Sequence, residues 1–478
     1  MTYLGLDLGT SGVKALLVDG AQQPIAEGHG ALSVQRPQPM WSEQDPLSWI
    51  TACGVAIAQV RAAAPDAFAA LRGVAVSGQM HGATFLDEND TPLRPAILWN
   101  DGRSHAECAE LEARADFRGI GGNIVMAGFT APKLRWVQKN EPEIFERTRK
   151  VLLPKDYVNL WLTGEYVSEM SDAAGTLWLD VAQRDWSDAL LSATDLTRDH
   201  MPRLVEGSAQ AGNLRAELAA SWGVGRVPVA GGAGDNAATA CGLGAVNPGQ
   251  GFLSLGTSGV LFSVTDAFAA NTDRAVHSFC HAVPATWHQM GVILSATDGL
   301  SWLGEITRQA PGDLAGMVVD VQTPSPITFL PYLSGERTPH NAPDATAAFL
   351  NLRRNHTLPD MVQAVMEGVG FAFADCCSAL EACGSVPQSV CVAGGGSQSE
   401  TWLQMLANIT GLTLDLPASG AQGAALGAAR LAILAASDVG EGEVLYAAQI
   451  GKSFSPDPAL VDAYAERLQL YQEAWSAP

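Results

Sequence analysis

A six-residue stretch that occurs twice is the feature of this sequence that most constrains its fold. Leu-Gly-Thr-Ser-Gly-Val occupies residues 8–13 and again residues 255–260, about half the chain apart. Each copy lies between two apolar runs, which predicts two strands of a hairpin joined by a tight glycine-containing turn. The repeat therefore predicts a duplicated fold, in which two domains begin with the same hairpin and the turns face each other across a cleft.

The rest of each half alternates short apolar runs with helical patterns. In "VPVAGGAGDNAATACGLGA" and "QSVCVAGGGSQSETWLQMLANITG" an apolar strand enters a glycine-rich turn and a helical stretch follows. This order is typical of α/β proteins, whose ligands bind at the carboxyl ends of the strands. A chain of 478 residues is longer than one core usually supports, and Asn247, Pro248 and Gly249 form a loop near its middle. We therefore predict domains of residues 1–246 and 247–478.

The charge of the chain argues against some classes of partner. The 50 acidic residues outnumber the 28 Lys and Arg and give a net charge of −22, which disfavours nucleic acid or an anionic membrane surface. A local loop and a metal ion can still hold phosphates on an acidic protein. The N-terminal stretch lacks the basic region of a signal peptide, no apolar run reaches ~18 residues, and the eight cysteines include no C-x-x-C pair. We expect a cytoplasmic protein with reduced thiols.

The two repeated turns are candidates for binding phosphate. Their glycines let successive backbone N–H groups converge, and the Thr and Ser hydroxyls add further donors. A single turn of this kind is more often a plain hairpin, but two matched copies favour the functional interpretation. Asp7 precedes the first turn, where a carboxylate can hold Mg²⁺ through water, and Lys14 follows it, where an ammonium can reach a phosphate.

Other predicted strand ends carry weaker signals. The three glycines at 394–396 could cradle a nucleotide or make a tight strand-to-helix connection, and the dinucleotide fingerprint and the P-loop are both absent. Gln79 and His81, bracketed by glycines, could be structural hydrogen-bonding residues or ligand contacts. The stretch "HSFCH" at 277–281 has no second ligand cluster at a fitting spacing, so we expect no zinc site there.

Asp235 is the only ionisable residue in the stretch "GGAGDNAAT" at 231–239. A helical run follows it, so one interpretation is a helix N-cap. The other is a general base near the start of a helix, with small neighbours that leave room for a sugar hydroxyl to come within hydrogen-bond reach.

With these features in place, the chain resembles the FGGY carbohydrate kinases, which belong to the actin and hexokinase fold superfamily. The resemblance lies in the duplicated turns, the isolated acid in "GDNAA", the late glycine run, and "GFTAPKLRWVQKN" with Lys133 and Trp136. Further blocks, "SGQMHG", "PAILWNDGR", "LLPKDY", "SDAAGT", "VHSFCHA" and "FLPYLSGERTPHN", are similar to the branch that phosphorylates D-xylulose. One departure is "FLNL", which has Asn351 where the family usually has Gly. Because Asn tolerates the left-handed region, we expect this turn to survive.

The resemblance implies an α/β fold of two duplicated actin/hexokinase-like (ribonuclease H-like) domains around a central cleft. It implies ATP-dependent transfer of phosphate to the C5 hydroxyl of D-xylulose, with the sugar site and base in the N-terminal domain and the nucleotide site in the C-terminal domain. A homodimer is also suggested. The residues that the family pattern and the turn chemistry together assign are Asp235 as base; Met80, His81 and Asn236 for the sugar; Thr10, Ser11, Lys14, Gly256 and Thr257 for phosphates; Gly395, Gly396 and Asn408 for the nucleotide; and Asp7 for Mg²⁺.

Two other classes of function stay open from the sequence. A related kinase could act on another ketose or polyol, such as ribulose, glycerol or gluconate. An actin-like or chaperone-like ATPase could use the same fold to move a partner protein, which predicts sugar-independent hydrolysis. A dinucleotide oxidoreductase is disfavoured because the fingerprint is missing.

Overall fold

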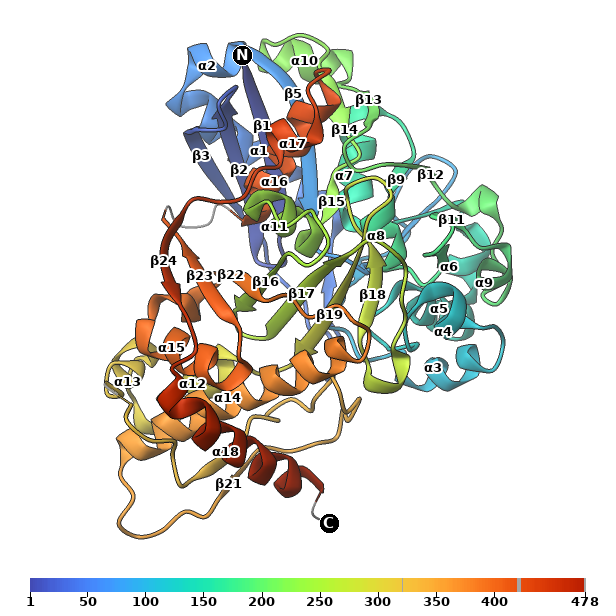
Figure 1. The fold of residues 1–478 in the computed structure, drawn as a ribbon. Coiled ribbons are helices and arrows are strands. Elements are labelled where there is room, and N and C mark those ends of the chain that lie inside the picture. The colour runs from blue at the N-terminus through green and yellow to red at the C-terminus, as the bar shows by residue number, and fades with distance from the viewer. Residues whose placement is uncertain (320, 419–422, 477–478) are drawn as a thin grey trace.

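Two mixed β-sheets form the framework of the protein. The computed structural model describes residues 1–319, 321–418 and 423–476. The first sheet has the order β13 (Gln210–Asn213), β14 (Pro228–Ala230), β5 (Leu71–Gly78), β1 (Thr2–Leu8), β2 (Gly12–Asp19) and β3 (Pro24–Ala31), with β15 (Ala233–Gly234) beside β5. The second has the order β18 (His277–Cys280), β19 (Trp287–Ile293), β17 (Gly259–Thr265), β16 (Gly251–Leu255), β22 (Ser389–Ala393), β23 (Thr413–Pro417) and β24 (Ile450–Phe454). Figure 1 shows the first sheet above the second.

The two sheets repeat one pattern of pairing. β1 pairs antiparallel with β2 and parallel with β5, and β16 pairs in the same way with β17 and β22. The hairpin turns fall at residues 9–11 and 256–258, inside the repeated hexapeptides. The predicted hairpins and the duplicated α/β fold are therefore confirmed.

Helices cover both faces of the first sheet. Alternate side chains of β1 (Leu4, Leu6, Leu8) join the core beneath α1 (Pro46–Ala63), whereas Tyr3 faces the opposite side with α11 (Asp235–Leu243) and α16 (Gly423–Ala435). Asp7 lies on the same side of the sheet as Tyr3, because side chains alternate along a strand. Its carboxylate therefore lies on the face that α11 covers.

The chain returns to the first sheet near its end. α16 contacts β1 and β5, and a Cβ on Gly5 would lie 2.0 Å from the carbonyl oxygen of Ala425, so only glycine allows this approach. In Figure 1, α16 and α17 (Glu441–Val444) accordingly lie beside the N-terminal strands. The boundary expected at 246/247 falls in the loop between α11 and β16, and the division into domains stays a prediction.

The second sheet has its own helical layer. It is formed by α12 (Thr297–Thr307), α14 (Leu358–Glu381), α15 (Glu400–Thr410) and α18 (Pro458–Ser476). A capping box starts α14, in which the Asp360 carboxylate accepts hydrogen bonds from the backbone N–H and hydroxyl of Thr357. Side chains of α14, α15, β16 and β17 share one core. One face of the second sheet thus packs in a core of its own, whereas Phe252, Phe262 and Met290 belong to a core shared with the first half of the chain.

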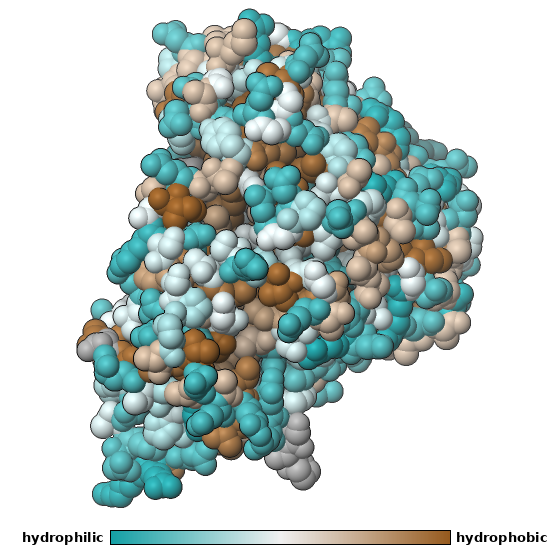
Figure 2. Space-filling view, in the orientation of Figure 1, coloured by the Kyte–Doolittle hydropathy of each residue, from teal (hydrophilic) through white to brown (hydrophobic). Residues whose placement is uncertain are grey.

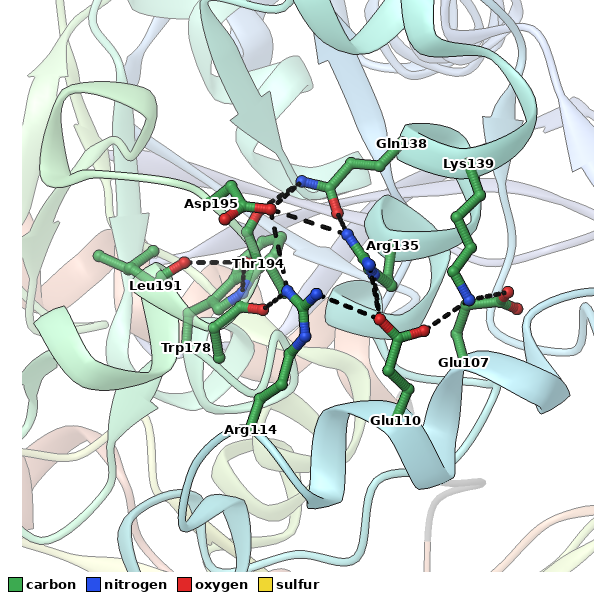
Figure 3. A network of polar contacts seen from close by, with 11 residues as sticks. Glu107, Glu110, Arg114, Arg135, Gln138, Lys139, Trp178, Leu191, Thr194 and Asp195 are labelled. Atoms are coloured by element: carbon green, nitrogen blue, oxygen red, sulfur yellow. Dashed lines mark hydrogen bonds and ion pairs between the residues drawn. The ribbon is translucent and has the colours of Figure 1, made fainter.

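A helical extension of the first domain includes α3 (His105–Glu112), α5 (Thr130–Asn140) and α7 (Pro154–Thr163). Figure 3 shows the polar network that ties it together: Arg135 binds Glu110, Arg114 binds Glu110 and Asp195, and Gln138 donates to the carbonyl of Thr194 at 2.7 Å. α5 also carries Lys133, which binds the backbone carbonyls of two residues that line the cavity described below.

The surface is mostly polar. On the face shown in Figure 2, hydrophobic residues lie in small separate groups among polar ones. Within the described ranges, none of the helices combines the length and the apolar composition needed to cross a bilayer.

Candidate active site

A cavity of about 400 Å³ lies between the two halves of the chain. Both domains contribute to its walls, and these are the residues that line it: Met80, His81, Trp99, Met126, Gly128, Phe129, Asp235 and Asn236 from the first, and Ser254, Gly256, Thr257, Ser258, Val260, His277, Phe279, Met290, Val292 and Arg337 from the second. The second hairpin turn is thus part of the wall. The first hairpin turn lies behind Trp99 of this wall, because the Thr10 hydroxyl accepts a hydrogen bond from Trp99 Nε1 at 3.0 Å. Ser11 beside it is exposed.

Asp235 is the first residue of α11 and faces this cavity. The helix is capped by Gly234, so the N-cap interpretation of Asp235 is wrong. Its Oδ1 accepts from the backbone N–H of Asn236 at 2.8 Å and from Asn236 Nδ2 at 3.0 Å. Oδ2 has no hydrogen-bond partner among the described residues, which leaves one carboxylate oxygen for a ligand.

The glycines before Asp235 have a packing role. A Cβ on Gly232 would lie 2.0 Å from the carbonyl oxygen of Val76 in β5, and its φ of 83° favours glycine. A Cβ on Gly234 would lie 2.9 Å from Met80. These residues therefore let the strand and Met80 approach, which fixes where α11 begins.

Two carboxylates lie close enough to influence each other at this point. Burial and, to a smaller extent, the charge of Asp7 together raise the pKa of Asp235 to about 7, against the hydrogen bonds from Asn236. Burial also raises the pKa of Asp7 to about 6, against the hydrogen bond from Ser77 Oγ at 3.2 Å and the charge of Lys14. Lys14 itself forms an ion pair with Glu27 at 3.0 Å. Both carboxyl groups therefore gain and lose a proton near neutral pH.

A buried charged cluster supports the start of α11. Lys155 Nζ donates to Asp156 at 2.6 Å and lies 3.8 Å from Glu169 and 3.7 Å from Asp172. Burial and the neighbouring acids, Asp235 among them, raise the pKa of Asp172 well above its usual range.

Ser171 connects this cluster to the base. Its hydroxyl donates to Glu169 and accepts from the backbone N–H of Gly234 at 3.1 Å, so it positions the residue before Asp235. Sequence reasoning assigned nothing to these groups. The available signal was a set of charged residues inside the apolar blocks "LLPKDY" and "SDAAGT".

Two neutral imidazoles lie in the cavity wall. His81 Nδ1 donates to the carbonyl of Gly175 at 2.7 Å, which leaves Nε2 without a proton, and burial lowers the pKa of His81 to about 3. His277 Nδ1 bonds Asn123 Oδ1 at 2.8 Å. The Asn123 amide nitrogen donates to two carbonyls, so its oxygen must accept and His277 also presents a bare Nε2. Both rings therefore offer acceptors to a ligand.

The side chain of Lys133 binds the backbone of His81. Lys133 Nζ donates to the carbonyl of His81 at 2.9 Å and to that of Gly128 at 2.7 Å. His81 has a φ of 69°, in the left-handed region, and the buried ammonium stabilises this conformation. The sequence indicated Lys133 through the family pattern and missed His277, which it considered only for zinc.

A second cavity, of about 530 Å³, lies on the other side of the second turn. Gly395 and Gly396 line it together with Thr297, Ser301 and Trp402. A Cβ on Gly396 would lie 2.3 Å from Leu255, so the glycine run packs directly on the strand that leads into the turn.

Asn408 and Asn351 lie away from both cavities. Asn408 is outside the residues that line the second cavity; its Oδ1 accepts from the backbone N–H of Asp457 at 2.8 Å. Asn351 has a φ of 64°, so the expected left-handed turn in "FLNL" is confirmed.

Comparisons with known proteins agree with this architecture. The models of the FGGY family of carbohydrate kinases match the chain at residues 2–242 (N-terminal domain) and 251–436 (C-terminal domain). The chain is 49% identical to a xylulose kinase of Escherichia coli K12, over 99% of the chain and 98% of that protein. It is 35% identical to a xylulose kinase of Lactococcus lactis, over 99% of the chain and 97% of that protein.

Solved structures give the same picture. A crystal structure described as a "xyloylose kinase" from Brucella ovis superimposes with a TM-score of 0.98 at 53% identity, covering 100% of this chain and 99% of that one. A xylulose kinase from Rhodospirillum rubrum has a TM-score of 0.91 at 28% identity, covering 100% and 98%.

Proposed function

The chain belongs to the FGGY family of carbohydrate kinases, and we propose that it transfers the γ-phosphate of ATP to the C5 hydroxyl of D-xylulose. One observation carries the proposal: Asp235 faces a cavity lined by the second glycine-rich turn, one of its carboxylate oxygens has no hydrogen-bond partner among the described residues, and burial is the main cause that brings its pKa to about 7. A general base works best when its pKa lies near the operating pH. The identity of 49% to a xylulose kinase along the whole chain supports the choice of sugar.

Each side chain of the cavity has a proposed role in binding the sugar. Asp235 accepts the proton of the C5 hydroxyl as that oxygen attacks the γ-phosphorus. Asn236 holds the other oxygen of the carboxylate through two hydrogen bonds, which orients it. His81 accepts from a sugar hydroxyl through its bare Nε2, and Met80 packs beneath the chain of carbons.

The phosphates are proposed to lie between the two turns. The backbone N–H groups and hydroxyls of Thr10, Ser11, Gly256 and Thr257 would donate to them, with Lys14 as a nearby positive charge. The nucleotide would extend into the second cavity along Gly395 and Gly396, toward α15, which carries Asn408.

Asp7 is the residue proposed to hold Mg²⁺. Its carboxylate receives one weak hydrogen bond and is raised in pKa by burial, so a cation would relieve an unfavourable charge. Within the described ranges no three His, Cys, Asp or Glu side chains gather as a metal site, which suits an ion held mainly by water and phosphate. When bound, Mg²⁺ neutralises charge that develops on the transferring phosphate.

In this mechanism the protein contributes mainly position and charge. The loose transition state of phosphate transfer needs little covalent help, and the base contributes about 10²–10⁴ in rate. Water competes with the sugar as nucleophile, so closing the two domains over the cavity would exclude it.

The test is ADP release with Mg-ATP against D-xylulose, D-ribulose, L-ribulose, glycerol and gluconate, with a no-sugar control. We expect strong preference for D-xylulose and a loss of about 10²-fold or more in Asp235→Ala. Preference for another polyol would overturn the choice of sugar. Release that ignores every sugar would overturn the kinase assignment and favour an ATPase switch. The homodimer and the cytoplasmic location stay predictions.

A further inference from the structure

Arg337 supplies the only cationic side chain among the residues that line the sugar cavity. It belongs to the segment after β20 (Thr328–Leu330), which is held against β19 by hydrogen bonds in both directions between Thr338 and Val292. This pairing places residue 337 beside the end of β19. The position is therefore fixed by backbone contacts on the following residue.

The guanidinium of Arg337 has an electrostatic neighbour in Glu336: burial lowers the pKa of Arg337, and the charge of Glu336 raises it. Within the part of the chain that the structure describes, the guanidinium forms no hydrogen bond and no ion pair. Its neighbour Glu336 is turned elsewhere, because Glu336 Oε1 accepts from the backbone N–H groups of Leu294 and of Arg337 itself. A half-buried guanidinium that makes no hydrogen bond to the described residues has donors available to a ligand in the cavity.

Arg337 lies in the part of the cavity that the imidazoles line. The residue after Arg337 pairs with Val292 of β19, two positions from Met290, which pairs with His277 in β18. Burial and then the charge of Arg337 lower the pKa of His277, in agreement with this placement. The cavity is thus lined by a carboxylate at the start of α11 and by a guanidinium from the segment beside β19.

The hydroxyls of Ser254, Thr257 and Ser258 and the Asn236 amide also line the cavity, but they belong to β16, the second turn and the start of α11, where the phosphates and the C5 hydroxyl are proposed to bind. The other polar groups of the cavity are poorly suited to a carbonyl group. His81 and His277 present bare nitrogens, which accept hydrogen bonds, and Trp99 Nε1 already donates to Thr10. A hydroxyl can satisfy an imidazole acceptor, but a ketone oxygen accepts only. Arg337 is the matching donor.

We propose that Arg337 determines specificity for ketoses by donating to the C2 carbonyl oxygen of the acceptor. This rests on the proposed function, in which the C5 hydroxyl lies at Asp235. An open-chain pentulose then extends away from Asp235 and brings its C1–C2 end toward Arg337. A polyol of the same length lacks the carbonyl oxygen that the guanidinium selects.

The experiment compares D-xylulose with xylitol and D-arabitol, the two products of reducing its C2 carbonyl. For wild type and Arg337→Met we would measure kcat/KM with each acceptor and the dissociation constant of each by calorimetry without nucleotide. Arg337→Lys keeps the charge without the fork of donors, and Arg353→Met removes an exposed arginine of the same domain as a matched control. Thermal melting verifies that each variant is folded.

We expect Arg337→Met to lower kcat/KM and affinity for D-xylulose about 10- to 100-fold, the range for a lost hydrogen bond to a charged group. The two polyols should change less than about threefold, Arg337→Lys should be intermediate, and Arg353→Met should match wild type. An equal loss with all three acceptors would overturn the proposal and assign Arg337 to a hydroxyl that the three acceptors share. No loss with any acceptor would exclude contact with the ligand. Wild type inactive on D-xylulose would instead refute the proposed function.

Discussion

Replacing Asp235 with Asn is expected to stabilise the protein in a pH-dependent way. The pKa of this carboxyl rises from an ordinary 3.8 to about 7 in the folded protein, first because of burial and then because of Asp7. The folded protein therefore holds the proton more tightly than the unfolded chain does. The carboxyl group favours folding at low pH, and this contribution is lost as the pH rises from about 3.8 through about 7.

The size of the effect follows from the shift. One pKa unit corresponds to about 1.36 kcal/mol, so the ionised carboxylate opposes folding by up to about 4 kcal/mol above pH 7. At pH 5, where chiefly the unfolded chain has ionised, the penalty is about 2 kcal/mol. Asn removes the charge and keeps an oxygen for the two donors of Asn236.

Melting temperatures of wild type and Asp235→Asn at pH 5 and pH 8 provide the assay. We expect the variant to melt about 4 °C higher at pH 8 and about half as much higher at pH 5, because the unfolding entropy of a chain this long makes 1 kcal/mol worth about 1 °C. Asp266→Asn, which removes an exposed carboxylate, controls for the general effect of lowering the charge of an acidic protein. If Asp235→Asn melts at the same or a lower temperature than wild type at both pH values, the claim that folding opposes the ionisation of Asp235 is refuted.

Three further perturbations test how the site is built. Gly427→Ala should lower the free energy of unfolding by about 1–3 kcal/mol and reduce turnover, because its Cβ would lie 1.8 Å from the carbonyl oxygen of Ala238 in α11. Gly442→Ala, where a Cβ meets open space, is the control, and equal denaturation midpoints for both would contradict this packing. Ser171→Ala leaves the buried N–H of Gly234 without its acceptor and should cost about 1–3 kcal/mol together with a lower kcat; normal kcat would remove Ser171 from the positioning of the base. D-xylulose with a non-hydrolysable ATP analogue should reduce the radius of gyration in small-angle scattering, and an unchanged curve would exclude domain closure.

The parts of the fold that the sequence predicted are local ones. A hairpin is determined by its own alternation and turn residues, so the two repeats were sufficient to predict β1–β2 and β16–β17. Asp235 could be singled out because its neighbours in sequence are also its neighbours in space. The return of α16 to the first sheet depends on packing between residues about 420 positions apart, such as Gly5 and Ala425. The periodicity of apolar residues along the sequence does not indicate such a contact.

The missed site residues share one physical cause. His277 meets Asn123 across 154 positions, and Ser171 meets Gly234 across 63. Arg337 reaches the cavity because the next residue pairs with β19. In each case the function depends on a tertiary hydrogen bond, and the sequence shows only an isolated polar residue in an apolar or turn segment.

The position of the transferred phosphate tests the central claim most directly. D-xylulose and Mg-ATP would be incubated with the protein, and the product examined by phosphorus and carbon NMR. We predict a phosphate ester on C5 and one ADP for each ester formed, with the signal abolished or strongly reduced in Asp235→Ala. An ester on another carbon would contradict the placement of the sugar against Asp235. Inorganic phosphate without any sugar ester would contradict the kinase itself.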